Sequence, residues 1–251
     1  STAAVRSSRA LPTALKTVMA WSLVRPGCWP RHRACRSARM SLALKRPEQA
    51  HPRLHAVVVD LMDPAATQQA AVELAKRFAV THFVHNAGVI RSDFLSDMKL
   101  DDLNALSQLH LGSAITLAQA VLPSMKQSRF GRIVLMSSRG ALGLQTRTAY
   151  AATKSGMMGM ARTWALELAA DGITVNVIAP GPIGGTDMFH AVIPKGSDRE
   201  AALGKAIPVQ RLGRPDDVAR TVMFFCDRAN SFITGQTLYV CGGASLGSIT
   251  I

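Results

Sequence analysis

From residue 50 onward, the pattern of apolar and polar positions alternates short apolar runs with longer segments whose apolar residues recur at helical spacing. Continuous β-branched runs separated by helices are typical of a parallel sheet buried on both faces. We therefore predict one α/β domain, a doubly wound parallel sheet of about seven strands if the N-terminus pairs normally. Strands are expected at 54–61, 81–85, 132–137, 174–179 and 237–240, and helices at 64–78, 100–125, 149–170 and 215–226.

Residues suited to ligand binding follow three of these strands. Ligands of open parallel sheets bind beyond the carboxyl ends of the strands. The segment 86–88 (Asn-Ala-Gly) follows the second expected strand, Ser138 the third, and the segment 180–183 (Pro-Gly-Pro-Ile) the fourth. The sequence therefore predicts a binding site at this edge of the sheet.

Tyr150 and Lys154 open the expected helix at 149–170, and a spacing of four places both on one helical face. A phenol has a reference pKa of about 10, which a nearby ammonium lowers. Such a pair can give a proton to a carbonyl oxygen or take one from an alcohol. Taken alone, the spacing favours an interfacial tyrosine with a solvated lysine over a catalytic pair.

A serine hydroxyl ends a strand ahead of this pair. Ser138 lies twelve residues before Tyr150, where its hydroxyl can meet the same substrate oxygen. Ser137 is the alternative, but its side chain should point to the opposite face. For either serine alone, the simpler interpretation is a strand-end hydroxyl bonded to local backbone.

Together, these motifs resemble those of the short-chain dehydrogenase/reductase superfamily, including 3-oxoacyl-acyl-carrier-protein reductase-like members, over about residues 45–246. The runs 211–215 and 234–236 add to the resemblance. It implies a Rossmann-type, three-layer α/β/α fold and hydride transfer between a nicotinamide and a carbonyl or secondary alcohol. It also implies Tyr150 as general acid/base, Lys154 as the group that lowers its pKa and holds the nicotinamide ribose, and Ser138 as a hydrogen-bond partner of the substrate. The implied cofactor contacts are Asp60, Asn86, Ala87, Gly88, Tyr150, Lys154, Pro180, Gly181, Ile183 and Thr186.

Three positions depart from the family pattern. His110 stands where the family usually has an asparagine that supports a water-linked proton path. It can relay protons through its two nitrogens, or it can be a structural helix histidine. An inserted glycine at 184–185 moves the expected threonine to Thr186, and Cys241 occupies a usual aspartate position.

The N-terminal segment 1–46 is a larger departure. It contains ten Lys or Arg residues, including Lys45 and Arg46, no acidic residue and a single glycine. The sequence therefore shows no strand followed by a glycine-rich phosphate loop and a helix in this segment. We treat it as an atypical basic segment in place of the first strand-helix-strand, followed by a dinucleotide-binding and catalytic domain at 47–251. Its composition resembles a mitochondrial presequence, although its length suits replacement of domain residues. A shifted reading frame over about residues 1–44 is the preferred hypothesis, which the coding DNA in three frames would test.

Charge and composition narrow the function classes. The net charge of +13 is concentrated in the basic segment, which leaves +3 for the remainder, so we expect no nucleic-acid partner. No run of eighteen apolar residues occurs, so we expect no membrane partner. The cysteines have no framework spacing, which favours a reducing, cytoplasmic location with mitochondria as the alternative, and no metal site is expected. They are Cys28, Cys35, Cys226 and Cys241.

We therefore expect an NAD(P)-dependent oxidoreductase acting on a small carbonyl or alcohol substrate. Arg46 lies where relatives that prefer NADP often carry a basic residue, so NADP is favoured over NAD. The alternative is a non-catalytic relative that binds no dinucleotide, because the phosphate loop is not readable. The apolar side chains of a mobile lid at 184–207 suggest a partly apolar substrate. The resemblance also implies a homodimer or homotetramer through the helices at 100–126 and 149–170.

Overall fold

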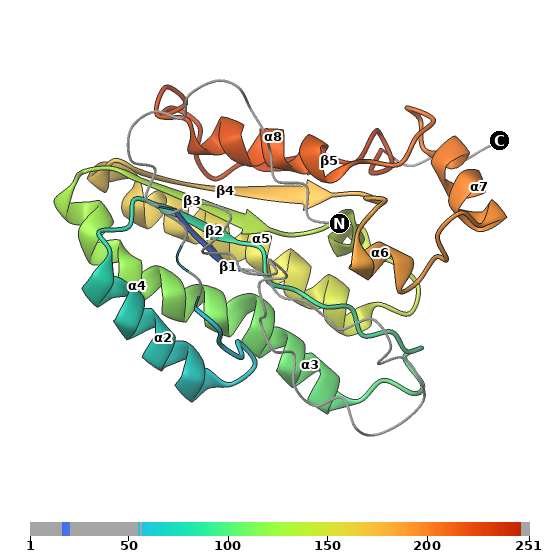
Figure 1. Cartoon of the computed structure of the whole chain (residues 1–251), viewed down its shortest axis with the longest axis horizontal. Coiled ribbons are helices and arrows are strands. Elements are labelled where there is room, and N and C mark those ends of the chain that lie inside the picture. Colours follow the sequence, from blue (N-terminus) through green and yellow to red (C-terminus); the bar gives the residue numbers. More distant parts are fainter. Residues whose placement is uncertain (1–16, 21–54, 56, 247–251) are drawn as a thin grey trace.

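The computed structural model describes residues 17–20, 55 and 57–246, which form a parallel sheet covered by helices on both faces (Figure 1). Every strand pair is parallel, and the sheet order follows the chain, β1-β2-β3-β4-β5. The three-layer α/β architecture expected from the sequence is confirmed. The strands are β1 (Thr17–Ala20), β2 (His82–His85), β3 (Gly131–Met136), β4 (Ile173–Pro180) and β5 (Thr237–Val240).

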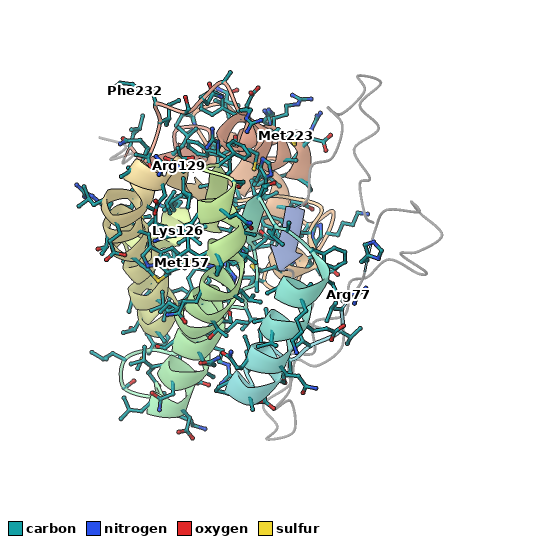
Figure 2. All side chains as sticks on the ribbon, turned by 90° about the vertical axis from the view of Figure 1, so that its left-hand side faces the viewer. Arg77, Lys126, Arg129, Met157, Met223 and Phe232 are labelled. Carbon is teal, nitrogen blue, oxygen red and sulfur yellow. The ribbon has the colours of Figure 1, made fainter. Side chains whose placement is uncertain are left out.

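The two faces of the sheet carry separate layers of helices. One layer contains α2 (Pro64–Arg77), α3 (Leu100–Ser107), α4 (Ser113–Gln127) and α5 (Thr148–Leu168), and α8 (Pro215–Cys226) covers the other face (Figure 1). The larger core lies under the first layer, where Met157 of α5 is fully buried (Figure 2). A smaller core joins β2, β3 and β4 to Phe225 of α8. Burial on both faces explains why the inner strands read as continuous apolar runs.

The N-terminal part of the sheet differs from the expectation. The run expected as a strand at 54–61 is not a strand in its described residues, where only Val59 forms an isolated bridge. A strand was not expected at Thr17–Ala20, yet this run pairs in parallel with β2. Strand pairing depends on a partner distant in sequence, and a four-residue run is too short to recognise from alternation. The described sheet therefore has five strands and not seven. The predicted division at residues 46 and 47 lies outside the described residues.

The helix expected at 100–125 is interrupted by a π-helical turn at Gln108–Gly112. The Ser113 hydroxyl donates to the Leu109 carbonyl oxygen at 2.6 Å within this turn. π-helical turns cannot be read from apolar spacing, and they occur often at functional sites. By length and composition, Leu100–Gln127 could cross a membrane. Its buried face packs in the larger core, which accounts for that apolar composition.

The segment expected to form a lid contains two short helices, α6 (Asp187–His190) and α7 (Asp198–Ala206). They lie beyond the carboxyl ends of the strands (Figure 1). Hydroxyl groups cap both helices: Thr186 accepts from the Phe189 amide, and Ser197 accepts from the Glu200 amide. These caps explain why helices form in a segment with little apolar periodicity.

Gly172, in the turn before β4, has a φ of 75°, and an added Cβ would collide with the Arg129 carbonyl oxygen. We expect Gly172→Ala to lower the free energy of unfolding by about 1–3 kcal/mol because this conformation suits only glycine. Urea unfolding followed by circular dichroism measures the change. Gly159→Ala, in α5 with open space around its Cα, is the control, and it should be neutral or stabilising by up to about 1 kcal/mol. Equal effects of the two changes would contradict the expectation.

Candidate active site

The parallel strands bring the predicted site residues to one edge of the sheet. Ser138 directly follows β3, and the segment 86–88 directly follows β2. β2 and β3 are paired in register, with His85 opposite Leu135. Helix α5 returns over the same edge and carries Tyr150 in its first turn. The topology thus gathers residues separated by more than sixty positions.

Lys154 is held inside the protein by backbone groups of α5 and β3. Its side chain is buried, and its Nζ donates a hydrogen bond to the Met136 carbonyl oxygen at 2.7 Å. The Ser137 hydroxyl in turn donates to the Lys154 carbonyl oxygen at 2.7 Å. Burial lowers the pKa of Lys154 to about 7. Near neutral pH this lysine therefore gains or loses its charge readily.

Tyr150 is buried with 7% of its surface exposed, and burial raises the pKa of its phenol. Two groups oppose that effect: a hydrogen bond with the Ser138 side chain and the positive charge of Arg147. Lys154 Nζ lies 5.8 Å from the centre of the Tyr150 ring and is bonded elsewhere. Arg147 therefore lowers the phenol pKa in this arrangement, and the same role for Lys154 stays a prediction from the sequence.

Ser138 and Ser137 point to different partners. The Ser138 hydroxyl lies beside Tyr150, and its Oγ also accepts a hydrogen bond from the Gly140 amide at 3.0 Å. Ser137 is buried, and its hydroxyl donates a hydrogen bond to the backbone of α5 at Lys154. This alternation follows from the two-residue period of an extended strand. Only Ser138 is placed to meet a substrate oxygen beside the phenol.

His110 lies in the π-helical turn with its ring edge toward Tyr150, the ring centres being 5.8 Å apart. Its Nδ1 is 2.8 Å from the Thr153 hydroxyl oxygen. Because that hydroxyl donates its one hydrogen to a backbone carbonyl of the preceding turn, Nδ1 carries the imidazole proton. Nε2 is then an acceptor, and it has no partner among the described residues. Burial, reinforced by the charge of Lys154, lowers the pKa of His110.

His85, at the end of β2, is a second buried histidine that the sequence analysis did not single out. Neither ring nitrogen makes a hydrogen bond of normal geometry in the described part of the chain. Burial, with a contribution from the charge of Lys154, lowers its pKa to about 3, so the ring is neutral near pH 7. Its position directly before Asn86 was visible in the sequence, but its burial was not.

Gly88 leaves space between these groups. A Cβ at this position would lie 3.1 Å from His110 Nε2 and 3.2 Å from Lys154 Nζ. Those two nitrogens are therefore at most about 6 Å apart. The unpartnered His110 Nε2 and the remaining donor capacity of Lys154 Nζ, which already bonds Met136, face a side-chain-free backbone and fit a polar ligand such as the ribose and amide of a nicotinamide nucleotide.

The remaining predicted cofactor residues lie in several different environments. Gly181 packs so closely on Cys241 that an added Cβ would lie 2.7 Å from that side chain, and Ile183 pairs with the chain at Gly213. The Thr186 hydroxyl is used within its own loop, since it donates to the Ile183 carbonyl oxygen and caps α6. The Asp60 carboxylate accepts from the Met62 amide at 2.9 Å. Pro180 is the last residue of β4, and Asn86 and Ala87 directly follow β2. Arg46 lies outside the described residues.

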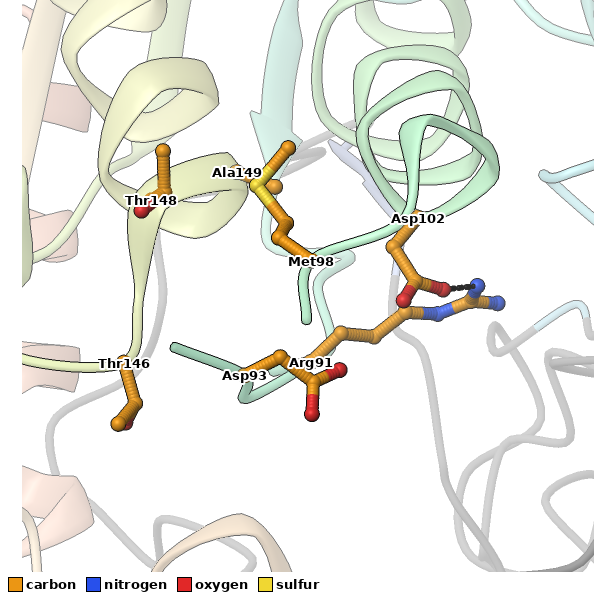
Figure 3. A pocket seen from close by; sticks show the side chains of 7 residues that line it. All are labelled: Arg91, Asp93, Met98, Asp102, Thr146, Thr148 and Ala149. Carbon is orange, nitrogen blue, oxygen red and sulfur yellow. Dashed lines mark hydrogen bonds and ion pairs between the residues drawn. The ribbon is translucent and has the colours of Figure 1, made fainter. Parts of the chain in front are cut away.

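A small cavity of about 10 Å³ adjoins the start of α5 (Figure 3). An ion pair between Arg91 and Asp102 forms one wall, and Thr146 and Thr148 form the other. This volume suits no more than about one water molecule. A wider hollow of about 440 Å³ lies between the lid segment and α8. Neither is lined by Tyr150 or Lys154, and no cluster of metal-ligating side chains occurs in residues 17–20 or 57–246.

The chain is similar in sequence to known reductases and dehydrogenases. A family model described as enoyl-(acyl carrier protein) reductase matches residues 36–245. The 3-oxoacyl-(acyl-carrier-protein) reductase of Salmonella typhimurium is 36% identical over 189 residues, covering 74% of this chain and 76% of that protein. The (2S)-[(R)-hydroxy(phenyl)methyl]succinyl-CoA dehydrogenase subunit BbsD of Thauera aromatica is 37% identical over 195 residues, covering 77% of both chains.

Solved structures with bound dinucleotide share the fold. A gluconate 5-dehydrogenase from Beutenbergia cavernae, solved with NADP, superposes with a TM-score of 0.72 and 31% identity over 77% of both chains. The protein ElxO with NADP bound gives a TM-score of 0.69 and 30% identity, covering 75% of this chain and 77% of that one.

Because the folded-state pKa of His85 lies below its unfolded value of about 6.5, protons bind the unfolded chain preferentially, and stability falls as the pH drops below 6.5. His85→Asn should remove up to about 2 kcal/mol of the stability that wild type loses between pH 6.5 and pH 5. Urea unfolding at both pH values measures this difference. His190→Asn, in the short helix α6 where the ring is only partly buried, is the control and should leave this loss unchanged. An unchanged loss in the His85 variant would contradict the expectation.

Proposed function

This chain belongs to the short-chain dehydrogenase/reductase family, and we propose that it transfers a hydride between NADP and the carbonyl carbon of a small substrate. The membership rests on the family match over residues 36–245 and on relatives at 36% identity. The observation that carries the proposal is the Tyr150 phenol, buried and hydrogen-bonded to Ser138 above the carboxyl edge of the sheet. NADP is favoured because the superposing proteins were solved with that dinucleotide bound.

The residues of the site divide the work between proton transfer and positioning. When bound, the reduced nicotinamide supplies the hydride to the carbonyl carbon. Tyr150 donates its phenolic proton to the carbonyl oxygen, and Ser138 donates a hydrogen bond to the same oxygen, which stabilises the charge that develops there. The reverse reaction returns the proton from the alcohol to the phenolate.

Lys154 and His110, which face the space beside Gly88, would support this transfer. The Lys154 ammonium faces the space beside Gly88, where a nicotinamide ribose would lie, while its bond to Met136 fixes it. His110 Nε2, an acceptor facing the same space, can accept a hydrogen bond from water or from Lys154. A pKa of about 7 suits Lys154 to proton exchange near neutral pH.

An assembly of two or four copies is part of the proposal. Ile115 of α4 and Leu166 of α5 are exposed apolar residues on helices of the larger layer. Exposed apolar side chains on neighbouring helices favour contact with a second surface. Size-exclusion chromatography with light scattering tests this, and a monomer at micromolar concentration would contradict it.

NADPH should bind the 251-residue chain with a dissociation constant in the micromolar range, because the nicotinamide end of the site is formed by described residues. Fluorescence titration with NADPH, and then with NADH, measures both affinities. Tighter binding of NADPH supports the proposed cofactor. No binding at millimolar NADPH would overturn the proposal and favour a non-catalytic member of the family.

Tyr150→Phe removes the only hydroxyl proposed to donate a proton. We expect turnover to fall by about a hundredfold to ten-thousandfold, the range for loss of a general acid. The affinity for NADPH should stay within about threefold, because the ring and its packing remain. Tyr239→Phe changes the only other tyrosine of the chain, in β5, and should leave turnover unchanged. Comparable loss in both variants would argue against a specific role for Tyr150.

A further inference from the structure

Arg147 is a buried cation next to the proposed proton donor. It precedes α5 directly and lies three residues before Tyr150. Only 9% of its surface is exposed. Its Nη1 donates to the Thr146 hydroxyl oxygen at 2.6 Å and to the Thr146 carbonyl oxygen at 3.3 Å. Its carbonyl oxygen accepts a hydrogen bond from the Ala151 amide at 2.7 Å, so Arg147 stands at the start of the helical turn that carries Tyr150.

No carboxylate among the described residues pairs with Arg147, since the five ion pairs found there involve other groups. Of the sixteen acidic side chains in the chain, only Glu48 lies outside the described residues. Charged groups this deeply buried are usually paired. A negatively charged group of a bound molecule would supply the counter-charge that the described residues do not provide.

The surroundings of Tyr150 add no negative charge. Ser138 is neutral, His85 and His110 are neutral near pH 7, and Lys154 is partly positive. A guanidinium has five N–H donors in a planar fork that matches the two oxygens of a carboxylate. Only Nη1 of Arg147 makes hydrogen bonds within the described part of the protein, and both go to Thr146. Donors therefore remain for a ligand beside the phenol.

We propose that Arg147 binds a carboxylate of the substrate, beside the carbonyl group that receives the proton of Tyr150. This inference rests on the proposed function and names its substrate class: short oxo acids in reduction, and the matching hydroxy acids in oxidation. Because Arg147 lies three residues before Tyr150 at the start of α5, the carboxylate would lie only a few atoms from the reacting carbon. Neutral ketones of the same size would lack this anchor and bind less tightly.

The test compares acids with their neutral methyl esters. Pyruvate, acetoacetate and levulinate span one to three bonds between carboxylate and carbonyl carbon, and the NADPH-dependent reduction of each is measured beside its ester. We expect wild type to prefer at least one acid. Arg147→Gln should lower kcat/KM for that acid by about tenfold to a hundredfold, the cost of losing one charge-assisted hydrogen-bond pair. Because Arg147 also lowers the pKa of the Tyr150 phenol, the ester should lose activity as well, but at least about threefold less than the acid, and Arg147→Lys should retain part of the preference.

Arg129→Gln is the matched control. It removes one positive charge at the opposite end of β3, where Arg129 bonds the Ala170 carbonyl oxygen on the surface. It should change neither acid nor ester kinetics. Equal losses for acid and ester in Arg147→Gln would mean that Arg147 acts only through Tyr150, and would overturn the proposal. A preference for dihydroxyacetone phosphate over all three acids would also overturn it, in favour of a phosphate anchor.

A binding measurement separates this inference from the proposed function. The preferred acid, or each of the three acids if no turnover is detected, is added to the purified chain and the rise in melting temperature is recorded. A rise that is present in wild type and Arg129→Gln but absent in Arg147→Gln supports the carboxylate site even where no hydride transfer occurs. Turnover of esters without any such rise would leave the oxidoreductase assignment intact and reject the role of Arg147.

Discussion

Two hydrogen bonds between β3 and α5 determine the rest of the site. The Ser137 hydroxyl bonds the Lys154 carbonyl oxygen, and Lys154 Nζ bonds the Met136 carbonyl oxygen. Together they fix the rotation and height of α5 on the carboxyl edge of the sheet. Tyr150, one turn earlier on the helix, is thereby brought to Ser138 at the end of the same strand. Because buried polar groups are costly unless paired, this contact has few alternative geometries.

Burial then determines the charges at the site. It raises the pKa of Tyr150 and lowers the pKa of Lys154 to about 7, so both groups tend toward their neutral forms. Arg147 keeps a positive charge close to the phenol without a carboxylate beside it in the described residues. A ligand that brings negative charge would stabilise the charged form of Lys154 as well. Binding and proton transfer are thus coupled through the same low-polarity surroundings.

Local patterns predicted most of the fold and part of the site. Helices such as α8 and strands such as β3 were recognisable because their signals are contiguous in sequence. The conjunction of Ser138 with Tyr150 followed from strand ends and helical spacing. By contrast, the pairing of β1, the loss of a strand near Val59 and the π-helical turn depend on contacts between distant segments. The effect of Arg147 on the phenol depends on burial, which no spacing rule reports.

The π-helical turn at Gln108–Gly112 also constrains the length of the chain. One residue more than an α-helical turn contains rotates everything beyond it by about 100°. The apolar stripes of α3 and α4 are therefore out of phase with each other, although both face the core. Deletion of a single residue in this turn would bring the two stripes into phase along one straight helix and turn Leu117 and Val121 away from the sheet. A point substitution at a half-buried position such as Gln108 should be tolerated more readily here than any change in residue count.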